Sequence, residues 1–128
     1  MSTYTLETRL AGPQSDIKTS EQITATGELP GLAEPIAIGA ADLEVIWQCD
    51  VSQVKLIIIT ADQDLTIETN NGTTPDNTIS LKADLPYIWR MNDYNTLKLT
   101  VDVTKLYVTN GSGVATTLKI AGLYDPTV

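Results

Sequence analysis

The chain has 128 residues, a length typical of one domain. Sixteen acidic and eight basic residues give a net charge of −8, which argues against a nucleic-acid partner because phosphate binding needs clustered Lys and Arg. With no histidine and a single cysteine, Cys49, the chain cannot build a Ser-His-Asp or Cys-His catalytic group or an intrachain disulfide, and a zinc site is equally disfavoured.

The distribution of apolar residues argues against a membrane-spanning protein and against a secretory signal. No segment is long and apolar enough for a membrane-spanning helix, and the first fourteen residues lack the apolar stretch of a secretory signal. We expect no membrane partner and no cofactor. Nineteen threonines, with many Ile and Val, favour strands because β-branched side chains pack well on a pleated surface.

Residues 1–42 combine short alternating segments, YTLETRL and QITAT, with breaks at AGP (11–13), LPG (29–31) and EP (34–35). Proline and glycine at these points interrupt any long regular element. We interpret residues 1–42 as an extended N-terminal arm or a set of edge strands, not as an independent domain, and residues 43–128 as a β-sandwich.

Alternating segments become regular from residue 43. LEVIWQC puts Leu43, Val45, Trp47 and Cys49 on one face, and VKLIIIT (54–60) is the near-continuous apolar run of a central strand buried on both faces. Three further strands are predicted in DLTIET (64–69), TISLK (78–82) and PYIWRM (86–91). The predicted inward residues of the first two are Leu65, Ile67, Ile79 and Leu81, and PYIWRM sets Tyr87, Trp89 and Met91 against Ile88 and Arg90.

The C-terminal third predicts three more strands. LKLTVDV (97–103) alternates most regularly, with Leu97, Leu99, Val101 and Val103 inward. KLYVT (105–109) and VATTLKIAGLY (114–124) are typical of a hairpin around an Asn110-Gly111 tight turn. The second strand would present Val114, Thr116, Leu118, Ile120 and Tyr124 on one face, with a bulge or a close backbone approach at Gly122.

About eight strands between residues 36 and 124, with turn signals every 8–12 residues, predict an all-β fold. We expect a single β-sandwich that is jelly-roll-like and carries an extended N-terminal arm. An immunoglobulin-like sandwich is the alternative, weakened by the missing Cys…Trp…Cys framework.

Few residues suggest a small-ligand site. Asp62 and Asp64 could offer oxygens to calcium, but two carboxylates are too few, so a solvated turn is the favoured interpretation and no metal site is predicted. A glycosidase carboxylate pair is not excluded by residue type. Cys49 is interpreted as a buried small hydrophobe, and the sequons at Asn71 and Asn110 as turn residues.

The aromatic residues leave two interpretations open. Tyr87 and Trp89 share a face and Tyr94 follows in MNDYNT, so the three rings could form a glycan-binding platform beside neighbouring amides. The favoured interpretation places Trp47 and Trp89 in a core that has no Phe. Tyr94, among polar neighbours, is expected at a surface or an interface.

Contact with another subunit or a partner protein is the second kind of site. The outer face of the closing strand is small and weakly charged, so it could lie flat against a neighbour, and the arm could fold back or extend onto another subunit. The candidate interface residues are Tyr4, Leu6, Leu10, Ile36, Ile38, Tyr94, Thr117, Lys119 and Ala121.

Residues 54–127 resemble the small all-β capsid decoration, or cement, proteins of tailed bacteriophages. The likeness lies in the apolar strand ending IIIT, in PYIWRM, and in the closing pattern Y-V-T-N-G-S-G-x-A-T-x-L-K-I-x-G-L-Y-D. The resemblance implies a non-enzymatic virion protein, made in the host cytoplasm and bound to the outer capsid surface. It would act as a homotrimer that bridges capsomers of the major capsid protein.

Two alternatives share the β class. One is a carbohydrate- or receptor-binding module of a tail fibre or adhesin, which the aromatic residues would serve. The other is a phage head–tail connector or tail component, which the sequence does not separate from a decoration protein.

Overall fold

The computed structural model describes residues 1–126; residues 127 and 128, the end of the predicted sandwich range, lie outside the described residues. Within residues 1–126 the regular elements are eleven strands and one 3₁₀ turn, η1 (Val51–Gln53), which confirms the all-β prediction. The strands are β1 (Ser2–Ala11), β2 (Asp16–Ala25), β3 (Gly27–Glu28), β4 (Leu32–Ile36), β5 (Leu43–Val45), β6 (Val54–Thr60), β7 (Leu65–Thr69), β8 (Thr78–Leu81), β9 (Tyr87–Arg90), β10 (Leu106–Thr109) and β11 (Thr116–Tyr124).

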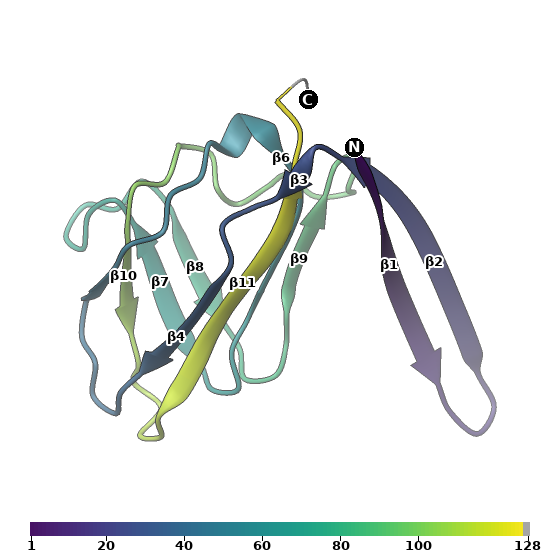
Figure 1. The fold of residues 1–128 in the computed structure, drawn as a ribbon. Coiled ribbons are helices and arrows are strands. Elements are labelled where there is room, and N and C mark those ends of the chain that lie inside the picture. The colour runs from purple at the N-terminus through teal and green to yellow at the C-terminus, as the bar shows by residue number, and fades with distance from the viewer. Residues whose placement is uncertain (127–128) are drawn as a thin grey trace.

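Two antiparallel sheets face each other and a separate hairpin projects from them (Figure 1). One sheet has the order β5-β10-β7-β8. The other has the order β3-β11-β6-β9, and β4 pairs with β11 along the same edge as β3. β1 and β2 pair only with each other. The jelly-roll connection of the strands stays a prediction.

The core lies between the two sheets and follows the alternation of the strands. Ile57 and Ile59 of β6, Ile67 of β7 and Leu118 of β11 are all buried in one apolar cluster. β6 lies between β11 and β9, as its apolar run predicts for a central strand. Trp47 is buried in the same cluster, and its indole N–H donates to the carbonyl of Pro30 at 2.7 Å.

The prediction of a strand at residues 97–103 is wrong. Leu97, Leu99 and Val103 are buried as predicted, but Val101 is 44% exposed and the segment makes only one isolated bridge, between Val103 and Cys49. Side chains take the place of a strand partner, because the amide of Lys98 donates to the Tyr87 hydroxyl and that of Thr100 donates to the Asn77 side chain. The alternating pattern therefore predicted which side chains are buried here, but not the absence of strand pairing.

The predicted Asn110-Gly111 hairpin is also wrong. β10 belongs to the four-stranded sheet and β11 to the five-stranded sheet, so the turn carries the chain from one layer to the other. The left-handed residue is Gly113, at φ +82°. Asn110 is 1% exposed and its side chain binds the turn, accepting from the Ser112 amide at 3.1 Å and donating to the Val114 carbonyl at 2.8 Å.

The close backbone approach predicted at Gly122 is confirmed. A Cβ at this position would collide with the carbonyl oxygen of Leu56 on β6 and would lie 3.2 Å from the Cα of Ile57. The register between β11 and β6 shifts immediately afterwards, between Leu123 and Tyr124. Only glycine allows the two strands to come this close.

Residues 1–42 divide between two places. β1 and β2 form the projecting hairpin, whereas β3 and β4 join the edge of the five-stranded sheet beside β11. The hairpin is attached to the sandwich through Thr26, whose amide donates to the carbonyl of Tyr124 at 3.1 Å.

Candidate functional site

The projecting hairpin is the most distinctive surface feature of the molecule. β1 and β2 pair in register over ten residues each, from Ser2 opposite Ala25 to Ala11 opposite Asp16. A short loop closes the hairpin, with the amide of Gly12 donating to the carbonyl of Ser15 at 2.8 Å. An isolated two-stranded hairpin of this kind is marginal in water unless one of its faces packs on something.

The register gives the hairpin one apolar and one polar face. Directly opposed residues share a face, so the pairs Tyr4–Ile23 and Leu10–Ile17 lie on the same side. Between them this side carries Leu6 with Glu21, and Thr8 with Thr19. The other side carries threonines, Gln22 and the charged residues of the tip. We define the base of the hairpin as residues 2–6 and 21–25, and the tip as residues 7–20.

The apolar face of the base packs on the outward side of the five-stranded sheet. Leu56 of β6 and Leu123 of β11 are buried together with Ala25, and they form a cluster separate from the core between the sheets. Partly buried side chains of the base and of β6 surround them, namely Tyr4, Leu6, Ile23 and Ile58. The sheet therefore has apolar residues on both sides at this point.

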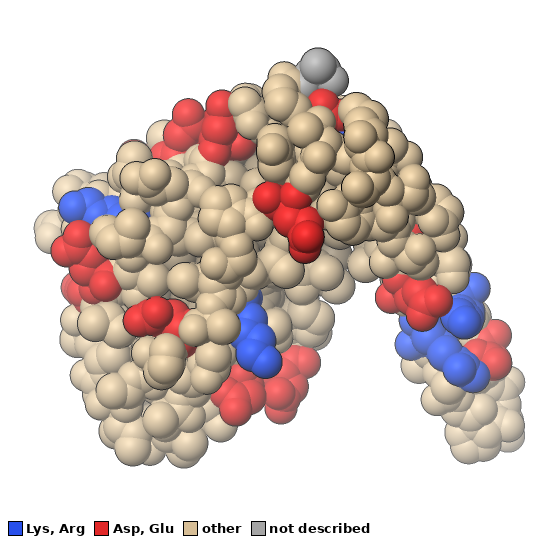
Figure 2. Space-filling model, in the orientation of Figure 1, with Lys and Arg blue, Asp and Glu red and all other residues tan. Residues whose placement is uncertain are grey.

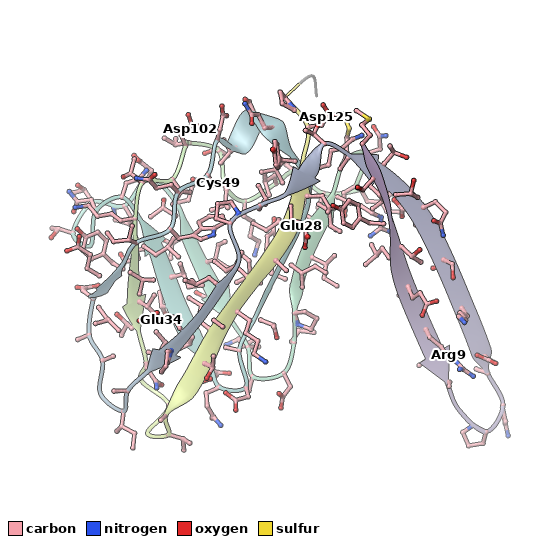
Figure 3. All side chains as sticks on the ribbon, viewed as in Figure 1. Arg9, Glu28, Glu34, Cys49, Asp102 and Asp125 are labelled. Carbon is pink, nitrogen blue, oxygen red and sulfur yellow. The ribbon has the colours of Figure 1, made fainter. Side chains whose placement is uncertain are left out.

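Polar contacts add to this packing along β2. Arg90 of β9 forms an ion pair with Glu21, with Nε 2.8 Å from Oε1. Lys55 of β6 donates to the carbonyl of Thr24 at 2.7 Å and lies 3.7 Å from the carboxylate of Asp125. Figure 3 shows Asp125 beside the base and Arg9 out on the tip. The base is thus held by apolar packing, an ion pair and a hydrogen bond from a lysine.

The tip diverges from the sandwich (Figures 1 and 2). Leu10 and Ile17 on its apolar face are 63% and 64% exposed. On its polar face the charges pair with each other, Arg9 with Asp16 at 3.2 Å and Lys18 with Glu7 at 3.9 Å. Figure 2 shows both signs of charge along the tip and a wide opening between the tip and the sandwich. The apolar side of the tip has no cover within the described chain.

The predicted interface residues are placed on three surfaces and in the core. Tyr4, Leu6 and Leu10 lie on the apolar face of the hairpin. Thr117, Lys119 and Ala121 lie on the outward side of β11. Ile38 and Tyr94 are exposed in loops, whereas Ile36 has no exposed surface and belongs to the core.

The three aromatic residues considered for a glycan platform are not exposed together. Tyr87 and Trp89 are half-buried and pack against the core, whereas Tyr94 is fully exposed. The Trp89 indole N–H donates to the carbonyl of Asn95 at 2.8 Å. Burial raises the pKa of the Tyr87 hydroxyl, which accepts a hydrogen bond from the amide of Lys98.

The other chemical candidates have structural partners. Asp62 accepts a hydrogen bond from the Thr116 hydroxyl, which lowers the pKa of its carboxyl, and Asp64 accepts from the amide of Ala83 at 2.8 Å. Cys49 is buried, and burial followed by the nearby Asp50 and Asp102 raises the pKa of its thiol to about 11. Across residues 1–126 no three His, Cys, Asp or Glu side chains are grouped to hold a metal ion.

Sequence reasoning missed three residues at the hairpin and the sheet beside it, namely Ile17, Ile58 and Ile88. The alternation of YTLETRL and that of residues 16–25, on either side of the Gly12-Pro13 break, was a signal for one long hairpin. Each short segment taken by itself does not specify the register or the shared apolar face. The apolar run of β6 predicts burial on both faces, whereas Ile58 lies half-buried on the outward face.

The chain matches no protein-family model, no curated protein and no solved structure. Among the described residues no helix has the length and apolar character needed to cross a membrane.

Proposed function

We propose that this chain is a non-enzymatic structural protein of a tailed-phage virion, which decorates the capsid and stabilises it by bridging capsomers. The observation that carries the proposal is the hairpin, whose base is fastened to the sandwich while the apolar side of its tip is uncovered. A protein that joins neighbouring capsomers needs a rigid body and a segment that reaches beyond it. The phage assignment itself comes from the sequence resemblance of residues 54–127.

The dimensions of the hairpin suit such a bridge. Ten residues per strand at the usual rise reach roughly 30 Å. Exposed strands with apolar side chains are a hazard for aggregation unless a partner covers them. Charges on the polar side, such as Arg9 and Lys18, keep that side in water and leave the apolar side to make the contact.

The proposed partners are a second copy of the chain, in a homotrimer, and the major capsid protein. The proposed location is the outer capsid surface, after synthesis in the host cytoplasm. In this account the sandwich rests on one capsomer and the hairpin carries contacts to a neighbouring subunit. The function then resides in surfaces and requires no reactive side chain.

Binding to shells tests the proposal. The chain would be added to shells formed by the major capsid protein encoded nearest to it, and co-sedimentation would be measured. We expect retention of the native chain and loss of retention for the double variant Leu10→Lys/Ile17→Lys, which places charges on the apolar side of the tip. The matched control, Ala11→Lys/Ser20→Lys, adds the same charge to the polar side and keeps binding. Absence of the native chain from sedimented shells would overturn the proposal.

A further inference from the structure

We propose that the apolar side of the hairpin tip packs on the outward face of the five-stranded sheet of a second copy of this chain. The inference rests on the proposed function and deepens it, because it names the surface through which copies associate. The apolar face of the hairpin and the outward face of the five-stranded sheet already pack together at the hairpin base, and they separate towards the tip.

The outward face of the sheet carries two successive apolar rows. In the first row Leu123 lies opposite Leu56 and Leu56 opposite Arg90, and the hairpin base covers this row. In the next row Ala121 lies opposite Ile58 and Ile58 opposite Ile88. We call Ala121, Ile58 and Ile88 the outer row. Ile88 is 39% exposed and Ala121 is exposed, whereas Ile58 between them is half-buried beside the base cluster, so the two ends of the outer row are uncovered.

The apolar face of the hairpin also consists of successive rows of paired residues. Its rows Tyr4–Ile23 and Leu6–Glu21 are at the base, where they pack beside Leu56 and Leu123. Beyond the polar row Thr8–Thr19, the row Leu10–Ile17 extends the same face, and it lies away from the sandwich because the tip diverges (Figure 1). One surface ends in an outer row with uncovered ends and the other in an uncovered tip. Both surfaces continue the interface between the hairpin base and the five-stranded sheet that already exists within one chain.

Charge is compatible with a copy of this chain as the occupant, which the continuity of the two surfaces favours. Residues 26–128 contain thirteen acidic and six basic residues, so the sandwich of any second copy is strongly acidic. The tip has two acidic and two basic residues, and they neutralise each other in the pairs Arg9–Asp16 and Lys18–Glu7. A neutral tip with an apolar side can approach an acidic body without the repulsion that opposes contact between two sandwiches.

Both halves of the interface are present on every copy. A tip that docks on a neighbour leaves the neighbour's own tip free to dock in turn. The contact therefore gives a reciprocal pair or a ring where the symmetry closes, and an open filament where it does not. The neighbour's outer row gains the cover that its own diverging tip does not provide. The acceptor residues are Ile58, Ile88 and Ala121, and the donor residues are Leu10 and Ile17.

Disulfide trapping between two separately purified variants tests this arrangement. Both carry Cys49→Ala, and one carries Leu10→Cys while the other carries Ile88→Cys; both added positions are exposed in the fold. The pure variants are mixed without any capsid protein and oxidised. We expect a disulfide-linked heterodimer, because a disulfide forms only when the two Cα atoms come within about 7 Å. Closure of a hairpin onto its own sheet cannot give this product.

The matched control replaces Leu10→Cys by Arg9→Cys, which moves the thiol to the polar side of the same tip. We expect the heterodimer to be lost in that mixture. Equal heterodimer from both mixtures, or no heterodimer from either, would overturn the inference. A product linking two Leu10→Cys chains in place of the heterodimer would place tip against tip and would also overturn it.

Light scattering gives a second readout that does not depend on trapping. The native chain is expected to be oligomeric at micromolar concentration, and Leu10→Lys/Ile17→Lys to be monomeric with an unchanged β-sheet circular dichroism spectrum. A native monomer would contradict the inference. Because no shell is present in either experiment, loss of self-association and loss of shell binding are measured separately.

Discussion

Arg90 on β9 and Glu21 on β2 form an ion pair, with Nε 2.8 Å from Oε1, that ties the hairpin base to the edge of the sandwich. Their side chains are 36% and 44% exposed, so solvent screens the pair and its contribution to global stability is about 0.5 kcal/mol. Its position matters more than its strength, because it lies near the point where the hairpin leaves the sheet.

Replacing Glu21→Gln is expected to loosen the hairpin base while the sandwich stays intact. The hydrogen-exchange rates of amides in residues 2–6 and 21–25 should rise, because local opening of the base loses one of its anchors. Rates in β6 should stay unchanged. Hydrogen exchange followed by mass spectrometry measures both regions in one experiment.

The control is Glu7→Gln, which removes the Lys18–Glu7 pair of the tip and leaves the base contacts in place. It should not alter exchange in the base. Equal effects of the two substitutions on the base would show that the Arg90–Glu21 pair does not anchor the hairpin.

The buried amide of Asn110 is expected to stabilise the turn that connects the two sheets. Its side chain donates to the carbonyls of Val114 and Ala37 and accepts from the amide and hydroxyl of Ser112. Asn110→Ala leaves these groups without that partner in a buried site, which should lower the free energy of unfolding by about 2 kcal/mol. Urea unfolding followed by tryptophan fluorescence measures the change.

Asn71→Ala is the matched control, because Asn71 also begins a sequon and accepts two amide hydrogen bonds, from Thr73 and Thr74, but is exposed. Water can replace its side chain, so the loss should be about 0.5 kcal/mol. If both variants lost the same stability, burial of Asn110 would not explain its contribution.

Gly122 should tolerate no side chain. Gly122→Ala places a Cβ against the Leu56 carbonyl oxygen and 2.6 Å from Cδ1 of Leu29, so β11 must move away from β6. We expect a loss of about 3 kcal/mol of stability. Gly111→Ala is the control, because a Cβ there meets nothing within 4 Å. A thermal midpoint for Gly122→Ala equal to that of Gly111→Ala would contradict the close approach.

Cys49 should make stability depend on alkaline pH. Burial raises the pKa of its thiol from 9.0 to about 11, so the folded chain keeps a proton that the unfolded chain releases. The thiol's contribution is complete below pH 9 and is lost as the pH rises towards 11. Between these values the native chain should lose stability more steeply than Cys49→Ala. Urea midpoints across this range measure the difference, and parallel curves for the two chains would contradict it.

Alternation in the sequence predicted which side chains are buried better than it predicted which backbones pair. Leu97, Leu99 and Val103 are buried as their spacing indicates, but residues 97–103 form no strand because side chains of Tyr87, Asn77 and Asn70 take up amides of this region. Such contacts join residues distant in sequence. Local periodicity contains no information about them.

The turn at Asn110 and the hairpin show the same limit. Asn-Gly between alternating segments favours a two-residue hairpin, yet the buried amide of Asn110 turns the chain into the opposite sheet. In residues 1–25 the alternation was visible, but the pairing of Leu10 with Ile17 depends on a register that two separate short segments do not specify. The close packing at Gly122 was predictable because a glycine inside a strand often marks a bulge or the close approach of another backbone.

We propose that the hairpin makes the contacts through which this protein assembles. A reconstruction of shells bearing the protein tests it most directly, since the tip is long enough to be traced. We expect density for residues 7–20 packed on a neighbouring subunit, with Leu10 and Ile17 buried there. Density that shows the tip free in solvent, while the sandwich alone contacts the shell, would contradict the claim.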